Sequence, residues 1–394
     1  MFTYFLWNIM LQMKGSKMKI NSIQWPVTFF ATSFGAGIFF LPQTVGPKVI
    51  GTHGTITILI LSSLVSLLGQ FTFYRFILIT DKKEYVSSAI LFIGKKAANA
   101  ISIAFLLSML LIAIINITTM INIICFSLSL NGSERIFVSL IISATLGSSF
   151  IFFNSKIEHL ASGIAFPSLL IVLFLSIYFY SHPAHPHSTE IQNISTSNLL
   201  TLFPVVLFSF NFSPCIQRFA QNKKDTAGDL RFFMFGILLI LIFISFIVFS
   251  LSNIFSPSDI KNMREINSDA LSYSANVTKN SFVAYISILT MILITSGAYT
   301  GTLTGVVDTI VSLGFKNKTL IVFVVSVITF IAGEANFEII KVIAALSTPI
   351  IAITVFIIPS AFFLKTNCNS IFRKIMMTLN LLIGIGICFL AIIL

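Results

Sequence analysis

Apolar residues dominate this chain in long unbroken runs, and few runs show the alternation of a strand or the polar stripe of a water-facing helix. A helix needs about 20 apolar residues to cross a bilayer, and most of the runs reach that length. Clusters of charged residues, proline, glycine and asparagine separate them. The pattern predicts an all-α polytopic membrane protein with about eleven transmembrane helices, at residues 24–46, 54–79, 98–130, 136–153, 159–180, 199–220, 232–255, 282–312, 319–333, 338–363 and 373–394.

The composition excludes a soluble enzyme. Of the 394 residues, 56% are hydrophobic and 9% are charged, whereas soluble domains carry about 25% charged residues. So few ionisable side chains cannot cover a water-facing surface of this size, and most of the surface has to face hydrocarbon. A membrane-embedded enzyme would need histidine or carboxylate clusters at membrane depth, and the five histidines lie in loops or at span ends. We therefore expect a membrane protein that is not an enzyme.

The positive charges sort by side of the membrane. With eleven spans and a cytoplasmic amino terminus, 18 of the 24 lysine and arginine residues fall on the cytoplasmic side. Cytoplasmic loops carry such an excess, so we expect the carboxyl terminus outside and a multi-pass protein of a bacterial inner membrane. The net charge of +11 thus reflects membrane topology and not a nucleic-acid partner. Since Met18 begins a short basic segment, we hypothesise that translation starts there and that no signal peptide is cleaved.

No segment has the spacing of a metal site. Three histidines, His182, His185 and His187, lie in one external loop, but no cysteine or carboxylate completes a convincing ligand set. An exposed proline-rich loop is the better interpretation. The four cysteines lie far apart and are expected to be free thiols. We expect no metal and no organic cofactor.

The first predicted span contains a helix break. Glycine and proline interrupt it within the sequence Thr32-Ser33-Phe34-Gly35-Ala36-Gly37-Ile38-Phe39-Phe40-Leu41-Pro42. The Gly-Ala-Gly run lets the backbone unwind, and the half-helix that resumes after it points N–H groups and a positive dipole end at the gap. Such a gap favours an anion such as a carboxylate. The alternative is close packing of small residues against another helix.

The sixth predicted span is interrupted in a similar way. Polar residues and a proline break its apolar run in the sequence Ser209-Phe210-Asn211-Phe212-Ser213-Pro214. Pro214 has no N–H, so the carbonyl of Phe210 loses its helical donor. A carbonyl without a donor favours an ammonium group or a cation.

The two breaks occupy corresponding places in two halves of the chain. Gly35 and Asn211 are 176 positions apart, about the distance between the starts of their spans. Corresponding interruptions indicate an inverted-repeat transporter with its binding site near the bilayer midplane. We expect five spans in each repeat and one additional helix. The expected divisions are a cytoplasmic tail (1–21), a first repeat (22–180), an external loop (181–198), a second repeat (199–364) and an eleventh helix (365–394).

A free amino acid carries an anion and a cation a few ångströms apart, and the two breaks offer N–H groups to one and carbonyls to the other. We expect both breaks to bind this small molecule through Thr32, Ser33, Gly35, Ala36, Gly37, Phe210, Asn211, Phe212 and Ser213. Outer candidates lie in the third span, where hydrogen bonding between helices is the alternative role: Asn116, Thr118 and Thr119.

The two breaks resemble those of a known family. Residues 32–42, with Phe-Gly-Ala-Gly and Phe-Leu-Pro, and residues 208–214 resemble the hydroxy and aromatic amino acid permeases of the amino acid-polyamine-organocation superfamily, most of all their serine and threonine branch. Further matches are Ser256-Pro257, Leu271-Ser272-Tyr273, Ala275-Asn276, Gly301 to Gly305, Asp308, Asn336 and Pro349-Ile350-Ile351-Ala352. The resemblance implies a LeuT-type fold with five-plus-five repeats. It also implies ion-driven uptake, usually with protons, of an amino acid such as serine or threonine.

Few ionisable residues lie inside the predicted spans, and such residues are functional candidates. We expect Asp308, with Thr302 and Thr304 on the same span, to carry ion coupling; the alternative is that Asp308 faces water at the end of the span. Thr302 stands where the serine branch commonly has a histidine, and Ala344 where a glutamate is expected. These departures leave four alternatives open. The coupling ion could be sodium, the transport mode could be exchange, the substrate could be that of the aromatic branch of the family, and the protein could be a sensor that no longer transports.

Overall fold

The computed structural model describes residues 20–128, 130, 132–153, 157–183, 196–222, 229–278, 280–366 and 371–393. The hypothesised start at Met18, most of the predicted cytoplasmic tail, and His185 and His187 lie outside these residues. The described helices are α2 (Ile20–Ser33), α3 (Ala36–Phe39), α4 (Leu41–Val45), α5 (Pro47–Ile77), α6 (Tyr85–Ile93), α7 (Lys95–Leu128), α8 (Ser133–Phe153), α9 (Ile157–Ser181), α10 (Thr196–Phe208), α11 (Ser213–Asn222), α12 (Asp229–Ser252), α13 (Pro257–Glu265), α14 (Ala270–Val277), α15 (Ser281–Ser312), α16 (Lys318–Ala335), α17 (Ile339–Val342), α18 (Thr348–Ile351), α19 (Ile358–Lys365) and α20 (Ile371–Ile393).

Each apolar run predicted from the sequence coincides with a helix or an interrupted helix. Eight stretches are long and apolar enough to cross a membrane, namely α5, α7, α8, α12, α15, α16, the stretch from α17 to α19, and α20. α9 adds a shorter apolar crossing, Pro167–Ser181. Two interrupted helices, α2 to α4 and α10 with α11, bring the number within the described residues to eleven. The all-α class and the approximate span count predicted from the sequence are confirmed.

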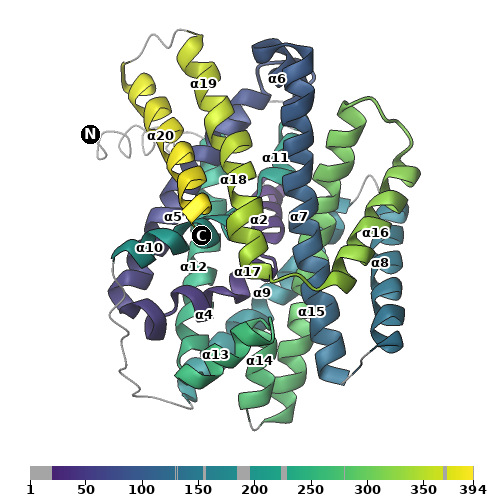
Figure 1. Ribbon diagram of the computed structural model, residues 1–394, viewed down its shortest axis with the longest axis vertical. Coiled ribbons are helices and arrows are strands. Elements are labelled where there is room, and N and C mark those ends of the chain that lie inside the picture. The colour runs from purple at the N-terminus through teal and green to yellow at the C-terminus, as the bar shows by residue number, and fades with distance from the viewer. Residues whose placement is uncertain are drawn as a thin grey trace.

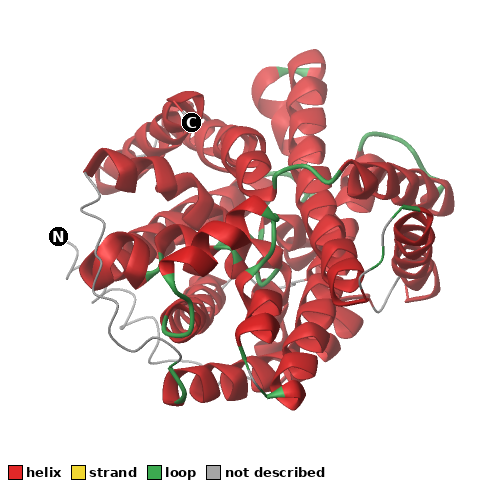
Figure 2. Ribbon diagram, turned by 60° about the horizontal axis from the view of Figure 1, so that its bottom comes forward, coloured by secondary structure: helices red, strands yellow, loops and turns green. Residues whose placement is uncertain are grey.

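The helices form a bundle with two distinct ends. The short helices α13 and α14 lie together at one end, and α6 lies at the other (Figure 1). α8 packs against α16 at one edge of the bundle (Figure 1). Figure 2 shows that helices make up nearly all of the described chain and that the loops between them are short. α15 packs against α2, α7, α9 and α11, so it contacts both interrupted helices.

Short sequence signals set the starts of the two peripheral helices α13 and α14. The hydroxyl of Ser256 accepts from the N–H of Asp259, and the Asp259 carboxylate accepts from the N–H of Ser256. With Pro257 in the first turn, this is a capping box. Asp269 caps α14 by accepting from the N–H of Ser272 at 2.8 Å. Both helices therefore begin where their local sequence directs.

The predicted tenth span is continuous but irregular. Two π-helical stretches, Ile343–Ser347 and Ala352–Ile357, widen it on either side of Pro349. Because Pro349 has no N–H, it cannot continue the regular hydrogen-bond ladder. The hydroxyl of Thr348 donates to the carbonyl of Pro204 at 3.1 Å and so joins this span to α10. The sequence predicted the span but not its π-helical turns.

Aromatic side chains join α2 to the helices around the second break. Phe29 of α2 stacks on Phe212, with ring centroids 4.6 Å apart, and contacts Phe219 of α11 and Phe233 of α12 at 5.2 and 5.1 Å. All four rings are fully buried. Because lipid is as apolar as these rings, the contacts stabilise the bundle through van der Waals packing and aromatic geometry. This core fixes α2, α11 and α12 about one turn away from the first break.

Candidate functional site

The first break lies between α2 and α3. α2 ends at Ser33, Phe34 and Gly35 leave the helical path, and α3 begins at Ala36. Gly35 is extended, with φ −115° and ψ −166°. The helix is thus interrupted at the Gly-Ala-Gly run that the sequence singled out.

Asn116 of α7 sits in this break. Its amide oxygen accepts a hydrogen bond from the N–H of Ala36 at 3.0 Å, and its amide N–H donates to the carbonyl of Ile112. A Cβ on Gly35 would lie 2.6 Å from the same oxygen, so only glycine leaves room for this contact. Gly37 is the second residue of α3, and the first N–H groups of a helix have no partner within that helix. Of the two N–H groups expected to meet a carboxylate, that of Ala36 is held by Asn116, and that of Gly37 has no partner within α3.

The second break lies between α10 and α11. α10 ends at Phe208, residues 209–212 leave the helix, and α11 begins at Ser213. The carbonyl of Phe210, which loses its helical donor at Pro214, accepts from the hydroxyl of Ser66 at 2.9 Å. A carbonyl oxygen has two lone pairs, so one is left for a ligand.

The two breaks face each other. A Cβ on Gly37 would lie 3.0 Å from two ring carbons of Phe208 and 3.7 Å from the hydroxyl oxygen of Ser209. α3 packs against α10, and α2 packs against α11. Segments far apart in the sequence therefore meet at one place, which is the arrangement that a site between two broken helices requires.

Two of the predicted binding side chains are engaged elsewhere in the protein. Asn211 accepts through its Oδ1 atom from Gln70 of α5 at 2.7 Å and from the N–H of Ser213 at 3.3 Å. Phe212 stacks on Phe29 in the aromatic core. Among the described residues, the buried hydroxyl of Ser213 has no hydrogen-bond partner. Ser213 is therefore available to a ligand, whereas Asn211 and Phe212 have structural contacts with α5 and α2.

Most of the predicted hydroxyl groups bond within their own helices. Each of the following donates to a backbone carbonyl three or four positions earlier: Thr32, Ser33, Thr119, Thr302 and Thr304. The hydroxyl of Thr118 is buried and has no partner. Such internal bonds leave each hydroxyl oxygen able to accept from a ligand.

Two glycines let α15 approach both broken helices. A Cβ on Gly301 would lie 2.9 Å from the hydroxyl oxygen of Thr32 in α2. A Cβ on Gly305 would lie 2.6 Å from the carbonyl oxygen of Pro214 in α11. Larger residues at these two positions would push α15 away from the breaks. The Gly301–Gly305 segment therefore has a packing role that its sequence alone did not reveal.

Asp308 of α15 forms an ion pair with Arg218 of α11. The Nε atom of Arg218 lies 3.1 Å from Oδ2 of Asp308, and Nη2 lies 2.9 Å from Oδ1. The two side chains are only 12% and 14% exposed. The planar guanidinium matches a carboxylate in this two-bond geometry and supplies its counter-charge. Sequence reasoning missed Arg218 as a site residue because it counted that arginine only as a cytoplasmic charge.

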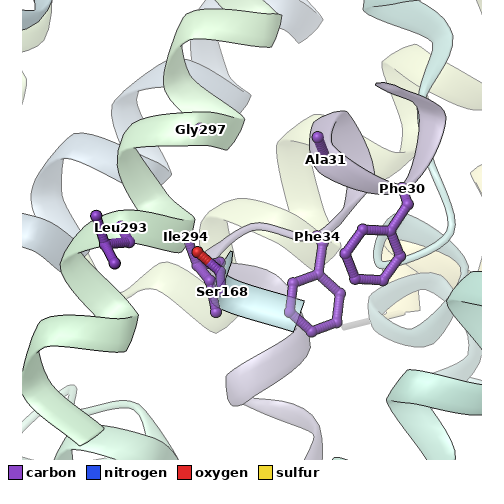
Figure 3. A pocket seen from close by; sticks show the side chains of 7 residues that line it. All are labelled: Phe30, Ala31, Phe34, Ser168, Leu293, Ile294 and Gly297. Carbon is purple, nitrogen blue, oxygen red and sulfur yellow. The ribbon is translucent and has the colours of Figure 1, made fainter. Parts of the chain in front are cut away.

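A small cavity lies beside the first break. Figure 3 shows its lining residues, which come from α2, the first break, α9 and α15, namely Phe30, Ala31, Phe34, Ser168, Leu293, Ile294 and Gly297. Its volume is about 10 Å³, which is room for about one water molecule. An amino acid does not fit there, and the ring of Phe208 already touches Gly37.

The sequence of this chain is similar to those of two bacterial membrane proteins over most of its length. It is 26% identical to the inner membrane transport protein YqeG of Escherichia coli strain K12, in an alignment that covers 92% of this chain and 95% of that protein. It is also 26% identical to the serine transporter SdaC of the same strain, with 87% of each chain covered. No protein-family model matches the chain.

The fold is shared with solved transporter structures. The manganese transporter of Eremococcus coleocola, in complex with an aromatic bis-isothiourea compound, superposes with a TM-score of 0.64 over 94% of this chain and 85% of that chain. The sequence identity is 13%, so this likeness concerns the fold alone. The predicted fold class, a polytopic helical transporter, is confirmed. The chain is thus a multi-pass membrane transporter, and its similarity to YqeG and SdaC confirms the resemblance to the hydroxy and aromatic amino acid permeases.

Proposed function

We propose that this chain is an ion-coupled secondary transporter that imports a small neutral amino acid, serine or threonine. The apposition of the two breaks, with Gly37 against Phe208 and Ser209, carries this proposal. The similarity to SdaC, a serine transporter, supports the choice of substrate. The resemblance to the serine and threonine permeases supports it independently through the residues of both breaks.

The chemistry of the breaks suits a zwitterion. The N–H of Gly37, and that of Ala36 once Asn116 moves aside, would receive the carboxylate at the positive end of a half-helix. The second lone pair of the Phe210 carbonyl would receive the ammonium group. Ser213, whose hydroxyl has no partner, would contact the side-chain hydroxyl of the substrate. The ligand brings both charges, so the site needs no buried ionised side chain of its own.

Protons are the proposed coupling ion, and Asp308 is the proposed coupling group. A proton bound to an oxygen of Asp308 neutralises the carboxylate and removes the counter-charge of Arg218. The interaction that joins α11 to α15 through this ion pair then weakens, and α11 is able to move. Thr302 and Thr304 lie on the same helix between Asp308 and the first break, so they would link protonation to the site. No cofactor is required besides this ion.

The proposed architecture is a LeuT-type inverted repeat. Residues 22–180 and 199–364 would form the two repeats, and the helix after residue 365 would be an addition. The distribution of lysine and arginine supports a bacterial inner membrane location with the amino terminus in the cytoplasm and the carboxyl terminus outside.

Uptake into proteoliposomes tests the proposal. The purified protein is given a mixture of the common amino acids under an inward proton gradient, with and without sodium, and the accumulated amino acids are identified by mass spectrometry. We expect serine or threonine to accumulate with protons alone. Accumulation of tryptophan or tyrosine, or a requirement for sodium, would contradict the substrate or the ion. If folded protein accumulates no amino acid, transport of amino acids is excluded and a sensing role becomes the better explanation.

A further inference from the structure

Four polar side chains form a stripe along one face of α5. They recur at every fourth position, and each is at most 1% exposed: Ser62, Ser66, Gln70 and Tyr74. Residues four apart lie on the same face of a helix. Polar groups inside an apolar span are costly unless they are bonded. α5 packs against α10, α11 and α12. Three members of the stripe form hydrogen bonds with the second break or with α12, so they are candidates for holding those segments in place.

Two members of the stripe hold consecutive residues of the second break. The hydroxyl of Ser66 donates to the carbonyl of Phe210 at 2.9 Å. The Nε2 atom of Gln70 donates to Oδ1 of Asn211 at 2.7 Å. Phe210 and Asn211 are 5% exposed or less, so water does not replace these bonds in the closed protein. One helical turn of α5 therefore holds both residues at once.

Residues close in sequence form few hydrogen bonds with the Phe210 carbonyl and the Asn211 side chain. Pro214 deprives the Phe210 carbonyl of the donor that a continuous helix would supply. Asn211 caps α11 by accepting from the N–H of Ser213, but that bond is long, at 3.3 Å. The Nδ2 atom of Asn211 and the Oε1 atom of Gln70 are buried without partners. The direction of the carbonyl and the start of α11 therefore depend on donors from α5.

α5 is itself anchored one turn further along. The hydroxyl of Tyr74 donates to the carboxylate of Asp229 in the first turn of α12. The ring of Tyr74 also packs on Phe219 and Phe233, with centroids 5.3 and 5.2 Å apart. The helix that carries Ser66 and Gln70 is thus fixed against its neighbours and provides a stable reference for the break.

We propose that Ser66 and Gln70 are positioning residues that preform the second break for its ligand. Ser66 directs the Phe210 carbonyl, and Gln70 fixes Asn211 and with it the start of α11. The identity of the ligand group as an ammonium rests on the proposed function. The positioning itself does not depend on that identity, and it can be measured without substrate.

The test compares four single variants of the full chain, Gln70→Leu, Ser66→Ala, Ser66→Thr and Ser62→Ala. Ser62 is the matched control, because it lies on the same face of α5 and is fully buried but its hydroxyl has no partner. Ser66→Thr keeps the hydroxyl and serves as the conservative rescue. Hydrogen–deuterium exchange of residues 209–217 is measured in the substrate-free protein, and KM and kcat are measured for the amino acid that the wild type accumulates.

We expect Gln70→Leu and Ser66→Ala to speed exchange in the break and to raise KM, each by about tenfold, with kcat within about twofold of the wild type. Ser62→Ala and Ser66→Thr should match the wild type in both measurements. If Gln70→Leu does not fold, the comparison of Ser66→Ala with Ser66→Thr decides.

Exchange in Ser66→Ala equal to that in Ser62→Ala would overturn the positioning role. So would a loss of kcat in proportion to a fall in Tm with KM unchanged, because a merely structural contact behaves in that way. If the wild type transports no amino acid, the proposed function fails, and the exchange data alone then decide whether the break is positioned by α5.

Discussion

A substitution at Gly37 gives the most direct test of whether the first break belongs to the proposed substrate site. A Cβ at this position lies 3.0 Å from the Cδ1 and Cε1 atoms of Phe208, which is closer than ordinary van der Waals contact. Valine adds two methyl groups beyond that Cβ. Because Phe208 is only 8% exposed and its helix is packed against α3, the ring has little room to withdraw. Gly37→Val should therefore hold the two breaks apart and cover the N–H that the substrate carboxylate would use.

The size of the effect follows from the contact. Overpacking in a well-packed interior costs about 1–3 kcal/mol. If that cost falls on the closed, substrate-bound arrangement, affinity falls by about 5-fold to 140-fold, since 1.4 kcal/mol is a factor of ten. The methyl groups of valine also cover the backbone N–H of residue 37, which places Gly37→Val at the upper end, where uptake is abolished in practice. Gly37→Ala, which adds the Cβ alone, should give an intermediate loss.

The assay is uptake by proteoliposomes that contain equal amounts of folded protein. Gly386→Val in α20 is the matched control, because no atom lies within 4 Å of a Cβ at that position. We expect Gly386→Val to transport at the wild-type rate and Gly37→Val to express and fold without transporting. Wild-type KM and kcat in Gly37→Val would refute the reasoning and remove the first break from the substrate site.

Two further predictions concern charged groups. Asp308→Asn should lower Tm, because it removes the two-bond ion pair with Arg218. It should also abolish the pH dependence of uptake, and an unchanged pH profile would dismiss Asp308 as the coupling group. The double variant Asp308→Asn/Arg218→Gln should recover Tm, because it also removes the guanidinium charge beside the neutral amide. Burial raises the pKa of Asp269 above its ordinary value near 3.8. The protonated carboxyl therefore contributes its full stability below that ordinary value, and the contribution is lost as the pH rises through the folded-state pKa. Asp269→Asn keeps an acceptor for the Ser272 N–H, so its Tm should match the wild type near pH 4 and exceed it as the pH rises above that value. Parallel Tm curves from pH 4 to 8 would contradict this.

Much of the fold was predictable from the sequence because the bilayer imposes local rules. A spanning segment has to be long and apolar, so the runs of the sequence and the helices of the structure agree one by one. The breaks were predictable for the same kind of reason. Gly35 weakens the helix locally and Pro214 removes a donor, and neither of these effects depends on distant residues. The π-helical turns around Pro349 were missed because a proline restricts the ladder without specifying how the helix adjusts.

The sequence by itself therefore determined the class, the spans and the two places where the backbone opens, since each follows from residues that are neighbours in the chain. Only the tertiary structure decided which groups meet there. Asn116 reaches Ala36 across 80 positions, Arg218 reaches Asp308 across 90, and Gln70 reaches Asn211 across 141. A hydrogen bond or an ion pair forms only when packing brings a donor within about 3 Å of an acceptor, and that packing is a property of the whole bundle.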